Sequence, residues 1–298
     1  MPTLYSQVDS NVRKTWGWIT AFALLLIGVG WYFSYYLDRP GILVFAVVLS
    51  FIQVWVSYYY SDKIVLSMAG ARPIEFKDNQ EIYRLVENLC ITAGLPTPKI
   101  YLITDPQPNA FATGRDEQHA VIALTTGLIE ILTKSELEGV ISHELSHIKN
   151  RDTFLQAAMV VLVGILTLIA DIFWRTSVRR SDNREERGGA IIAILGLALI
   201  FISPILGKLM QMAISRKREF LADASGAMIT RNPEGLASAL EKIAVFPHNM
   251  RRASDATAHL FIVNPLRGKD AADFMSRIFS THPSVAERIA ALRESNIQ

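Results

Sequence analysis

The chain has 298 residues with 30 basic and 28 acidic side chains, and its formal net charge of +2 is too small to indicate a nucleic-acid-binding protein. Half of the residues are hydrophobic, only 19% are charged, and the mean hydropathy of +0.25 argues against an ordinary soluble protein. This composition indicates a membrane protein with a sizeable soluble part. The single cysteine, Cys90, excludes an internal disulfide.

Four apolar stretches are each long enough to cross a bilayer, because about 20 helical residues span the hydrocarbon core. Little more than Asp38 and Arg39 separates the first two, so we expect a tight transmembrane hairpin. Asp171 and Pro204 interrupt the third and fourth near their ends, so an apolar hairpin packed on the soluble domain, or lying in the membrane interface, is an alternative for that pair. The four stretches are residues 15–37, 40–61, 153–170 and 188–207.

Between the second and third apolar stretches the sequence predicts helices and short strands. Residues 79–94, NQEIYRLVENLCITAG, have the apolar spacing of an amphipathic helix. KIYLI at residues 99–103 and HAVIAL at residues 119–124 are typical of short strands. Thr133 and Glu136 form a capping-box pattern, which predicts the start of a further helix.

That further helix contains HELSH, in which His143 and His147 are four residues apart. Residues at this spacing lie about 40° apart around a helix and about 6 Å apart along it, so both imidazoles can bind one zinc ion. Glu144 lies about 100° from His143 around the helix, where it can take a proton from a water on the ion rather than act as a ligand. The pattern predicts a hydrolytic zinc site; the alternative is two surface histidines beside an exposed glutamate.

A third protein ligand is expected elsewhere in the chain. The long zincin pattern needs a glycine and a histidine at positions that are here Asn150 and Thr153, so that class is excluded. A glutamate from a second helix is another common solution, and EFLAD offers Glu219 with Asp223 one turn later on the same face. We expect Glu219, which has the longer side chain, to bind zinc and Asp223 to accept a hydrogen bond from a ligand imidazole. On their own, two acids at this spacing are typical of a solvated helix face.

The motifs HELSH, EFLAD, NAFATG, AHLFIVNPL and THPSVAERI together resemble those of the HtpX-type membrane metalloproteases, relatives of the CAAX prenyl proteases, and the resemblance covers nearly the whole chain. It implies a mainly helical α+β fold, with four transmembrane helices and a gluzincin-like zinc metallopeptidase domain that has a small sheet. It further implies one Zn²⁺ per chain and an endopeptidase that removes misfolded or damaged membrane proteins in stress response and quality control. The implied partners are unfolded or membrane-protein polypeptides and the lipid bilayer, without nucleic acid.

The resemblance also assigns roles to NAFATG and THPSVAERI. The first four residues of NAFATG would lie on an exposed edge strand, where an extended substrate pairs through backbone hydrogen bonds. His282 would stabilise the oxyanion, and the guanidinium of Arg288 would support the site. Taken alone, these segments would be an ordinary strand end and a loop histidine before a proline. The strand residues are Asn109, Ala110, Phe111 and Ala112.

These inferences divide the chain into four parts. Residues 1–61 would form a transmembrane hairpin, and residues 62–152 the first part of the metallopeptidase domain, with the HExxH helix. Residues 153–210 would form a second transmembrane hairpin with a polar link, and residues 211–298 the second part of the domain, with the third zinc ligand. Because the ligands must meet, the chain has to cross the membrane an even number of times between them.

The resemblance implies a multi-pass protein of the bacterial inner (plasma) membrane with its active site facing the cytoplasm. Basic residues beside the expected zinc site and before the first apolar stretch favour the same side. The polar link at residues 175–187 contradicts this rule, since it holds five arginines against three acids. The cytoplasmic side is still favoured, because more basic residues lie beside the expected zinc site and before the first apolar stretch, and because the number of crossings between the ligands is even. We expect residues 216–218 to anchor a helix end at lipid headgroups. The basic residues are Arg13, Lys14, Lys149, Arg151, Arg216, Lys217 and Arg218.

Two other functions are weighed against a broad membrane protease. A prenyl-peptide protease would use the same chemistry, but it would want a large enclosed chamber, for which four segments are few. A non-enzymatic scaffold or transporter with relic motifs is disfavoured, because Glu144 is retained and the sequence has no intramembrane ionisable pair or inverted repeat. We expect His119, His248 and His259 to be structural or surface residues.

Overall fold

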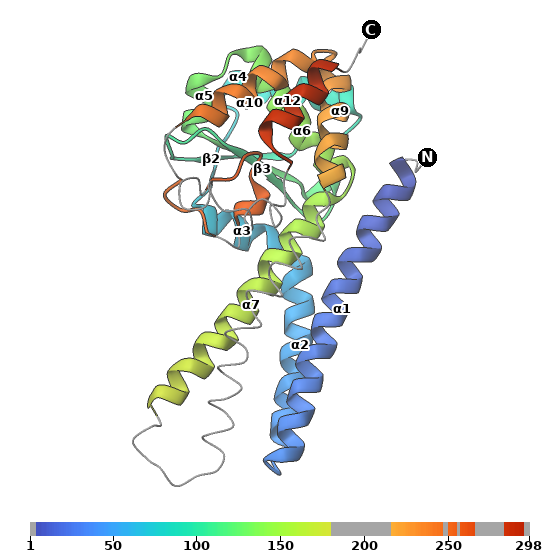
Figure 1. Ribbon diagram of the computed structural model, residues 1–298, viewed down its shortest axis with the longest axis vertical. Helices are drawn as coiled ribbons and strands as arrows, with labels where there is room; N and C mark the ends of the chain where they lie inside the picture. The colour runs from blue at the N-terminus through green and yellow to red at the C-terminus, as the bar shows by residue number, and fades with distance from the viewer. Residues whose placement is uncertain (1–3, 180–215, 247–249, 255–256, 266–282, 295–298) are drawn as a thin grey trace.

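The fold combines a compact domain with long helices that run away from it (Figure 1). In the described part, the domain is mainly helical with a small mixed sheet, which confirms the expected α+β class. The fourth predicted apolar stretch, residues 188–207, and His282 lie outside the described residues. The computed structural model describes residues 4–179, 216–246, 250–254, 257–265 and 283–294.

Two long helices are apolar enough to cross a membrane, judged by length and composition. They are α1 (Leu4–Tyr36) and α2 (Gly41–Tyr59), which pack together as the predicted hairpin. α7 (Asp152–Arg179) leaves the domain in the same direction, and it counts as a third span only when joined to α6 (Lys134–Lys149), from which it is bent by 80°. Among the described residues, two helices can span a membrane, or three if the bent pair counts as one span, so the prediction of four spans is not confirmed.

The sheet that the described residues form has the strand order β1-β2-β4-β3. β2 and β4 are parallel, and β1 and β3 pair antiparallel with β2 and β4 respectively. Every residue of β4 is buried, which explains why its first four residues are all apolar. KIYLI is confirmed as a strand, but HAVIAL begins later than expected, because His119 belongs to the 3-10 turn η1 (Glu117–His119). The strands are β1 (Arg72–Pro73), β2 (Lys99–Ile103), β3 (Ala110–Thr113) and β4 (Val121–Thr125).

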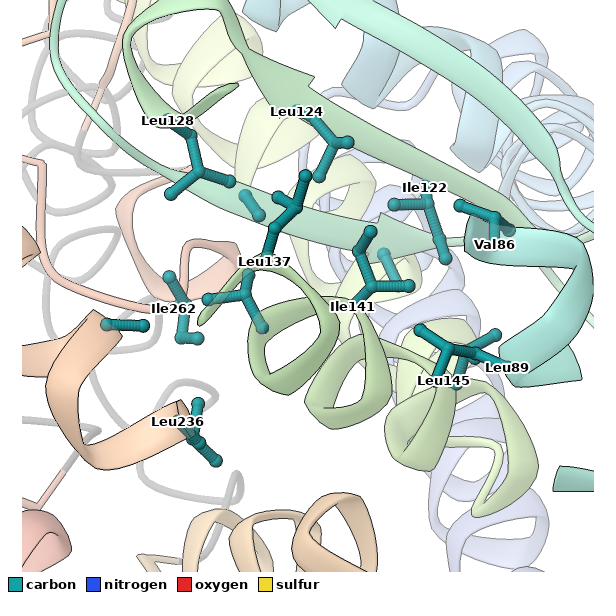
Figure 2. Close-up of a cluster of buried hydrophobic side chains, with 14 of the residues drawn as sticks. Val86, Leu89, Ile122, Leu124, Leu128, Leu137, Ile141, Leu145, Leu236 and Ile262 are labelled. Atoms are coloured by element: carbon teal, nitrogen blue, oxygen red, sulfur yellow. The ribbon is translucent and has the colours of Figure 1, made fainter. Parts of the chain in front are cut away.

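The helix α6 lies at the centre of the domain and is covered on every side. One face packs on the sheet and on α4 (Gln80–Ala93), as Figure 2 shows for Leu137, Ile141 and Leu145 beside Ile122 and Leu124. Its other faces are covered by α9 (Arg216–Thr230) and α10 (Pro233–Val245). The shorter elements are α3 (Ser61–Ala69), α5 (Thr126–Ile131), η2 (Ala258–Leu260) and α12 (Val285–Glu294).

The predicted helix ends are confirmed by their hydrogen bonds. Asn79 caps α4, and Gly94 ends it with a left-handed φ of 70°. Thr133 and Glu136 make both hydrogen bonds of the capping box that begins α6. These local signals therefore fix where the central helix starts, and with it the depth at which its histidines lie.

The carboxylate of Glu136 also joins α6 to α10. It accepts hydrogen bonds from the Ser238 hydroxyl at 2.6 Å and the Lys242 ammonium at 2.7 Å, besides the Thr133 amide at 2.8 Å. Burial would raise the pKa of this carboxyl, but the hydrogen bonds outweigh burial and hold the pKa at about 2.

We expect Glu136→Gln to lower the melting temperature of the purified protein near neutral pH, by an amount that shrinks as the solution is acidified. A carboxyl with a depressed pKa stabilises the fold fully above its unfolded pKa of 4.5, and the contribution is lost as the pH falls through the folded value of about 2. The measurement is the difference in melting temperature between the two proteins at each pH across this range. A difference independent of pH would contradict the assignment.

Candidate metal centre and active site

The last two turns of α6 carry the HELSH residues into the interior of the domain. His143, Glu144 and His147 are all buried, with exposed fractions of 1%, 2% and 6%. The apolar residues Ile141 and Leu145 of the same helix face the core, so the histidines are directed toward α9. The alternative of two surface histidines beside an exposed glutamate is therefore wrong.

α9 crosses α6 at very short range because Gly226 lies against the backbone of His143. A Cβ atom at position 226 would be 2.9 Å from the His143 nitrogen, closer than real Cβ atoms approach. One and two turns earlier on α9, Asp223 and Glu219 are buried beside the histidines. Glu219 lies 3.9 Å from His143 Nε2 and 3.7 Å from His147 Nε2. The structure thus brings together the three predicted ligands, whose ligand atoms all lie within 4.8 Å of one another.

Each of the two imidazoles has a carboxylate at its Nδ1 atom. Asp223 Oδ1 is 2.9 Å from His143 Nδ1, and Asp152 Oδ2 is 3.2 Å from His147 Nδ1. A carboxylate at Nδ1 favours a proton on that nitrogen, which leaves the lone pair on Nε2. The two Nε2 atoms face each other at 3.1 Å. Two nitrogen ligands of tetrahedral zinc lie about 3.3 Å apart for bonds of about 2.0–2.1 Å, so the pair fits a shared metal ion.

The charges around the histidines also fit a divalent cation. Four buried carboxylates face two buried guanidinium groups, so neutral imidazoles leave two negative charges to be balanced. Charges removed from water must be compensated nearby, and Zn²⁺ would balance this pair. The carboxylates are Glu144, Asp152, Glu219 and Asp223, and the guanidinium groups are Arg218 and Arg288.

Burial and these charges shift the pKa values of the site in opposite directions. Burial, helped by Arg288, lowers the pKa of His143 to about 4. Burial would also lower the pKa of His147, but Asp152 and Glu219 outweigh it and raise the pKa to about 9. Burial raises the pKa of Glu144 to about 7, and the charge of Glu219 adds to this increase. Negative charge is thus concentrated around His147, where a cation would be stabilised most.

Arg288 lies at the site, as the resemblance implied. Its guanidinium binds Asp223 through two hydrogen bonds of 2.8 and 2.6 Å, and it lies 3.5 Å from Glu219. It also donates to the carbonyl of Ile262 at 2.9 Å. Arg288 therefore holds Asp223 in position behind His143 and fixes the segment around Ile262.

The predicted substrate strand is an edge strand of the described sheet, but it is not exposed. Asn109, Ala110, Phe111 and Ala112 are all buried. The carbonyl of Ala110 accepts a hydrogen bond of 3.0 Å from the amide of Ile262, and the amide group of Asn109 donates to Val263 at 2.8 Å. A segment from far along the chain thus occupies part of the edge. Further along the same strand, the amide of Ala112 donates to the carboxylate of Glu144.

One further expectation is corrected by the structure. Arg216 and Lys217 are exposed, but Arg218 is buried and pairs with Asp152 at 3.2 Å, so it is not a headgroup anchor. Asp152 itself was not predicted, although an acid at the start of an apolar stretch, five residues after His147, was a signal. His259 is buried near the carbonyl of Gln156, which agrees with a structural role.

Comparisons with known proteins show the family to which this chain belongs. The family model described as peptidase family M48 matches residues 77–296. A protein named protease HtpX homolog from Caldanaerobacter subterraneus subsp. tengcongensis is 43% identical, covering 99% of both chains. One from Pyrococcus furiosus is 44% identical, covering 91% of both chains. The crystal structure of S. mikatae Ste24p covers 97% of this chain and 67% of its own, with a TM-score of 0.52 and 16% identity, a likeness of fold.

We expect Gly226→Ala to weaken Zn²⁺ binding by at least about 10-fold, because the new methyl group must push α9 away from α6 and carry Glu219 with it. The measurement is Zn²⁺ affinity by competition with a chromophoric chelator. Gly164→Ala on α7 is the matched control, since a Cβ atom there would meet open space. Equal affinities for the two variants would show that the contact between α6 and α9 does not set the ligand geometry.

Proposed function

This chain belongs to peptidase family M48, and from that membership we propose that it is an integral-membrane zinc endopeptidase with one Zn²⁺ held by His143, His147 and Glu219. The observation that carries the proposal is the pair of Nε2 atoms 3.1 Å apart, each on an imidazole whose Nδ1 atom faces a carboxylate. When bound, zinc would supply a Lewis acid that acidifies water and polarises a peptide carbonyl.

Glu144 is the residue that moves protons in this proposal. It lies directly after His143 and is turned about 100° from it around α6, so it flanks the three ligands without joining them. The amide of Ala112 holds its carboxylate. From this position Glu144 would take a proton from the attacking water and pass it to the leaving amine.

The other site residues would position these groups. Asp223, gripped by Arg288, would keep the Nδ1 proton of His143 in place and so leave Nε2 available for the metal. His282 would stabilise the oxyanion; this role rests on the resemblance of THPSVAERI alone, since the residue lies outside the described part.

We propose that the substrates are unfolded or misfolded membrane polypeptides, cleaved in stress response and quality control. The names of the HtpX homologs support the proteolytic part of this proposal. The position of the site supports the membrane part, because α7 begins three residues after α6 ends. Residues 109–112 would bind the extended substrate, which would have to displace the segment at Ile262 from Ala110, because the amide of Ala112 on the same strand already bonds to Glu144.

We further propose that the domain faces the cytoplasm from the bacterial inner membrane. Lys149 is the last residue of α6, and Arg13 and Lys14 follow Asn11, which bonds to Asn150 and Asp152 at the same corner. Basic residues where the membrane helices meet the domain support this orientation through the positive-inside rule. The turn between α1 and α2 would then lie on the opposite side.

We expect Glu144→Gln to retain bound zinc and to lose at least about 100-fold in the rate of cleavage of an unfolded membrane protein, because general-base catalysis contributes that much. Glu219→Ala should instead purify without zinc, because this substitution removes a metal ligand rather than the general base. Elemental analysis and gel assays of cleavage separate the two outcomes. A Glu144→Gln variant with half of the normal rate would exclude Glu144 as the base.

The orientation is testable with an impermeant maleimide on intact cells. Cys90 is 1% exposed, and burial raises the pKa of its thiol to about 11, so it must be replaced rather than used. In a Cys90→Ala background, Arg39→Cys between α1 and α2 should react in intact cells, while Ile91→Cys on α4, which is 74% exposed, should react only after lysis. The reverse pattern would place the domain outside.

A further inference from the structure

Asp152 lies at the meeting point of three helices. It is the first residue of α7, is 1% exposed, and turns back toward the end of α6. One carboxylate oxygen, Oδ2, lies 3.2 Å from His147 Nδ1. The other, Oδ1, accepts hydrogen bonds from Asn11 Nδ2 at 2.7 Å and from an Arg218 guanidinium nitrogen at 3.2 Å. The two oxygens therefore connect an imidazole on one side to α1 and α9 on the other.

Asn11 brings the first membrane helix into this network. Its side chain is 4% exposed, and its amide nitrogen donates both to Asp152 and to the carbonyl of Asn150 at 2.9 Å. These acceptors flank the corner at which α6 turns by 80° into α7, where Arg151 has a left-handed φ of 59°. A single amide group on α1 thus clamps the corner that carries Asp152.

The arrangement around His147 repeats the one around His143. Each imidazole has a carboxylate at Nδ1, and each carboxylate is held by a buried arginine: Asp223 by Arg288, and Asp152 by Arg218. The difference is that only Asp152 is held in addition by a residue of an apolar membrane helix. A salt bridge that served packing alone would not need an oxygen aimed at the imidazole.

We infer that Asp152 is a positioning residue that orients His147 for the metal, and that Asn11 holds Asp152 in place, so that the first membrane helix supports the active site directly. The inference rests on the proposed metal site at His143, His147 and Glu219. An oriented carboxylate partner of a ligand histidine contributes about 10 to 100-fold to metal affinity. Asn11 acts one step further from the metal, so its contribution should lie at the lower end of this range.

The test uses the full chain in lipid nanodiscs, with Zn²⁺ affinity measured by chelator competition and the visible spectrum of the Co²⁺-loaded protein as a report on ligand geometry. Asp152→Asn should weaken Zn²⁺ binding by about 100-fold and Asn11→Ala by about 10-fold, with altered Co²⁺ bands in both. The control is Thr15→Val on the same helix, a buried position whose hydroxyl donates to the backbone carbonyl of Asn11 at 2.8 Å, so that its loss leaves the side-chain amide of Asn11 untouched. Control and wild type should agree.

The double variant Asn11→Ala/Asp152→Asn should bind Zn²⁺ no more weakly than Asp152→Asn alone, because Asn11 acts through Asp152. Additive losses, or an Asn11→Ala protein that matches Thr15→Val in affinity and in Co²⁺ spectrum, would overturn the inference. If Asp152→Asn does not fold, the comparison of Asn11→Ala with Thr15→Val decides alone. If wild type and Thr15→Val themselves bind no Zn²⁺, the proposed metal site fails instead.

Discussion

The structure depends on one electrostatic constraint, the burial of four carboxylates around two imidazoles inside a protein domain. Unpaired charges at such depth would cost far more free energy than the domain gains by folding. Arg218 and Arg288, which come from different helices, balance part of the negative charge of the carboxylates. The negative charge that remains suits a divalent cation. Four helices, α6, α7, α9 and α12, therefore meet at this point because each supplies part of a charge balance that none could achieve alone.

Short-range patterns made much of the domain predictable from the sequence. The capping box at Thr133, the amphipathic helix of residues 79–94 and the strand KIYLI each depend on neighbouring residues only, and all are confirmed. The histidine pair was predictable because helix geometry brings residues four apart to one face. Glu219 and Asp223 needed chemical reasoning as well, because a zinc site with two histidines demands a third ligand.

What could not be predicted depends on contacts between distant parts of the chain. Arg218 has the local setting of a headgroup anchor, and only its pairing with Asp152, 66 residues away, reveals a buried role. The edge strand at Ala110 was predicted to be exposed, because Ile262, which covers part of it, is 152 positions further along the chain. Asn11 carries no signal at all, since its partners lie 139 and 141 residues away. Periodicity and capping describe the local environment of a residue, whereas these roles come from tertiary packing.

The position of Arg288 on α12 has a consequence for the biosynthesis of the protein. α12 follows every other described element in the chain, so it leaves the ribosome after all of them. Until it docks, Asp223 lacks the guanidinium that compensates its charge, and the carboxylate behind His143 is not held in its final orientation. A chain still being synthesised therefore has its histidines and its membrane helices but an incomplete centre. The support behind His143 is therefore completed only when α12, the last described helix, packs against α9.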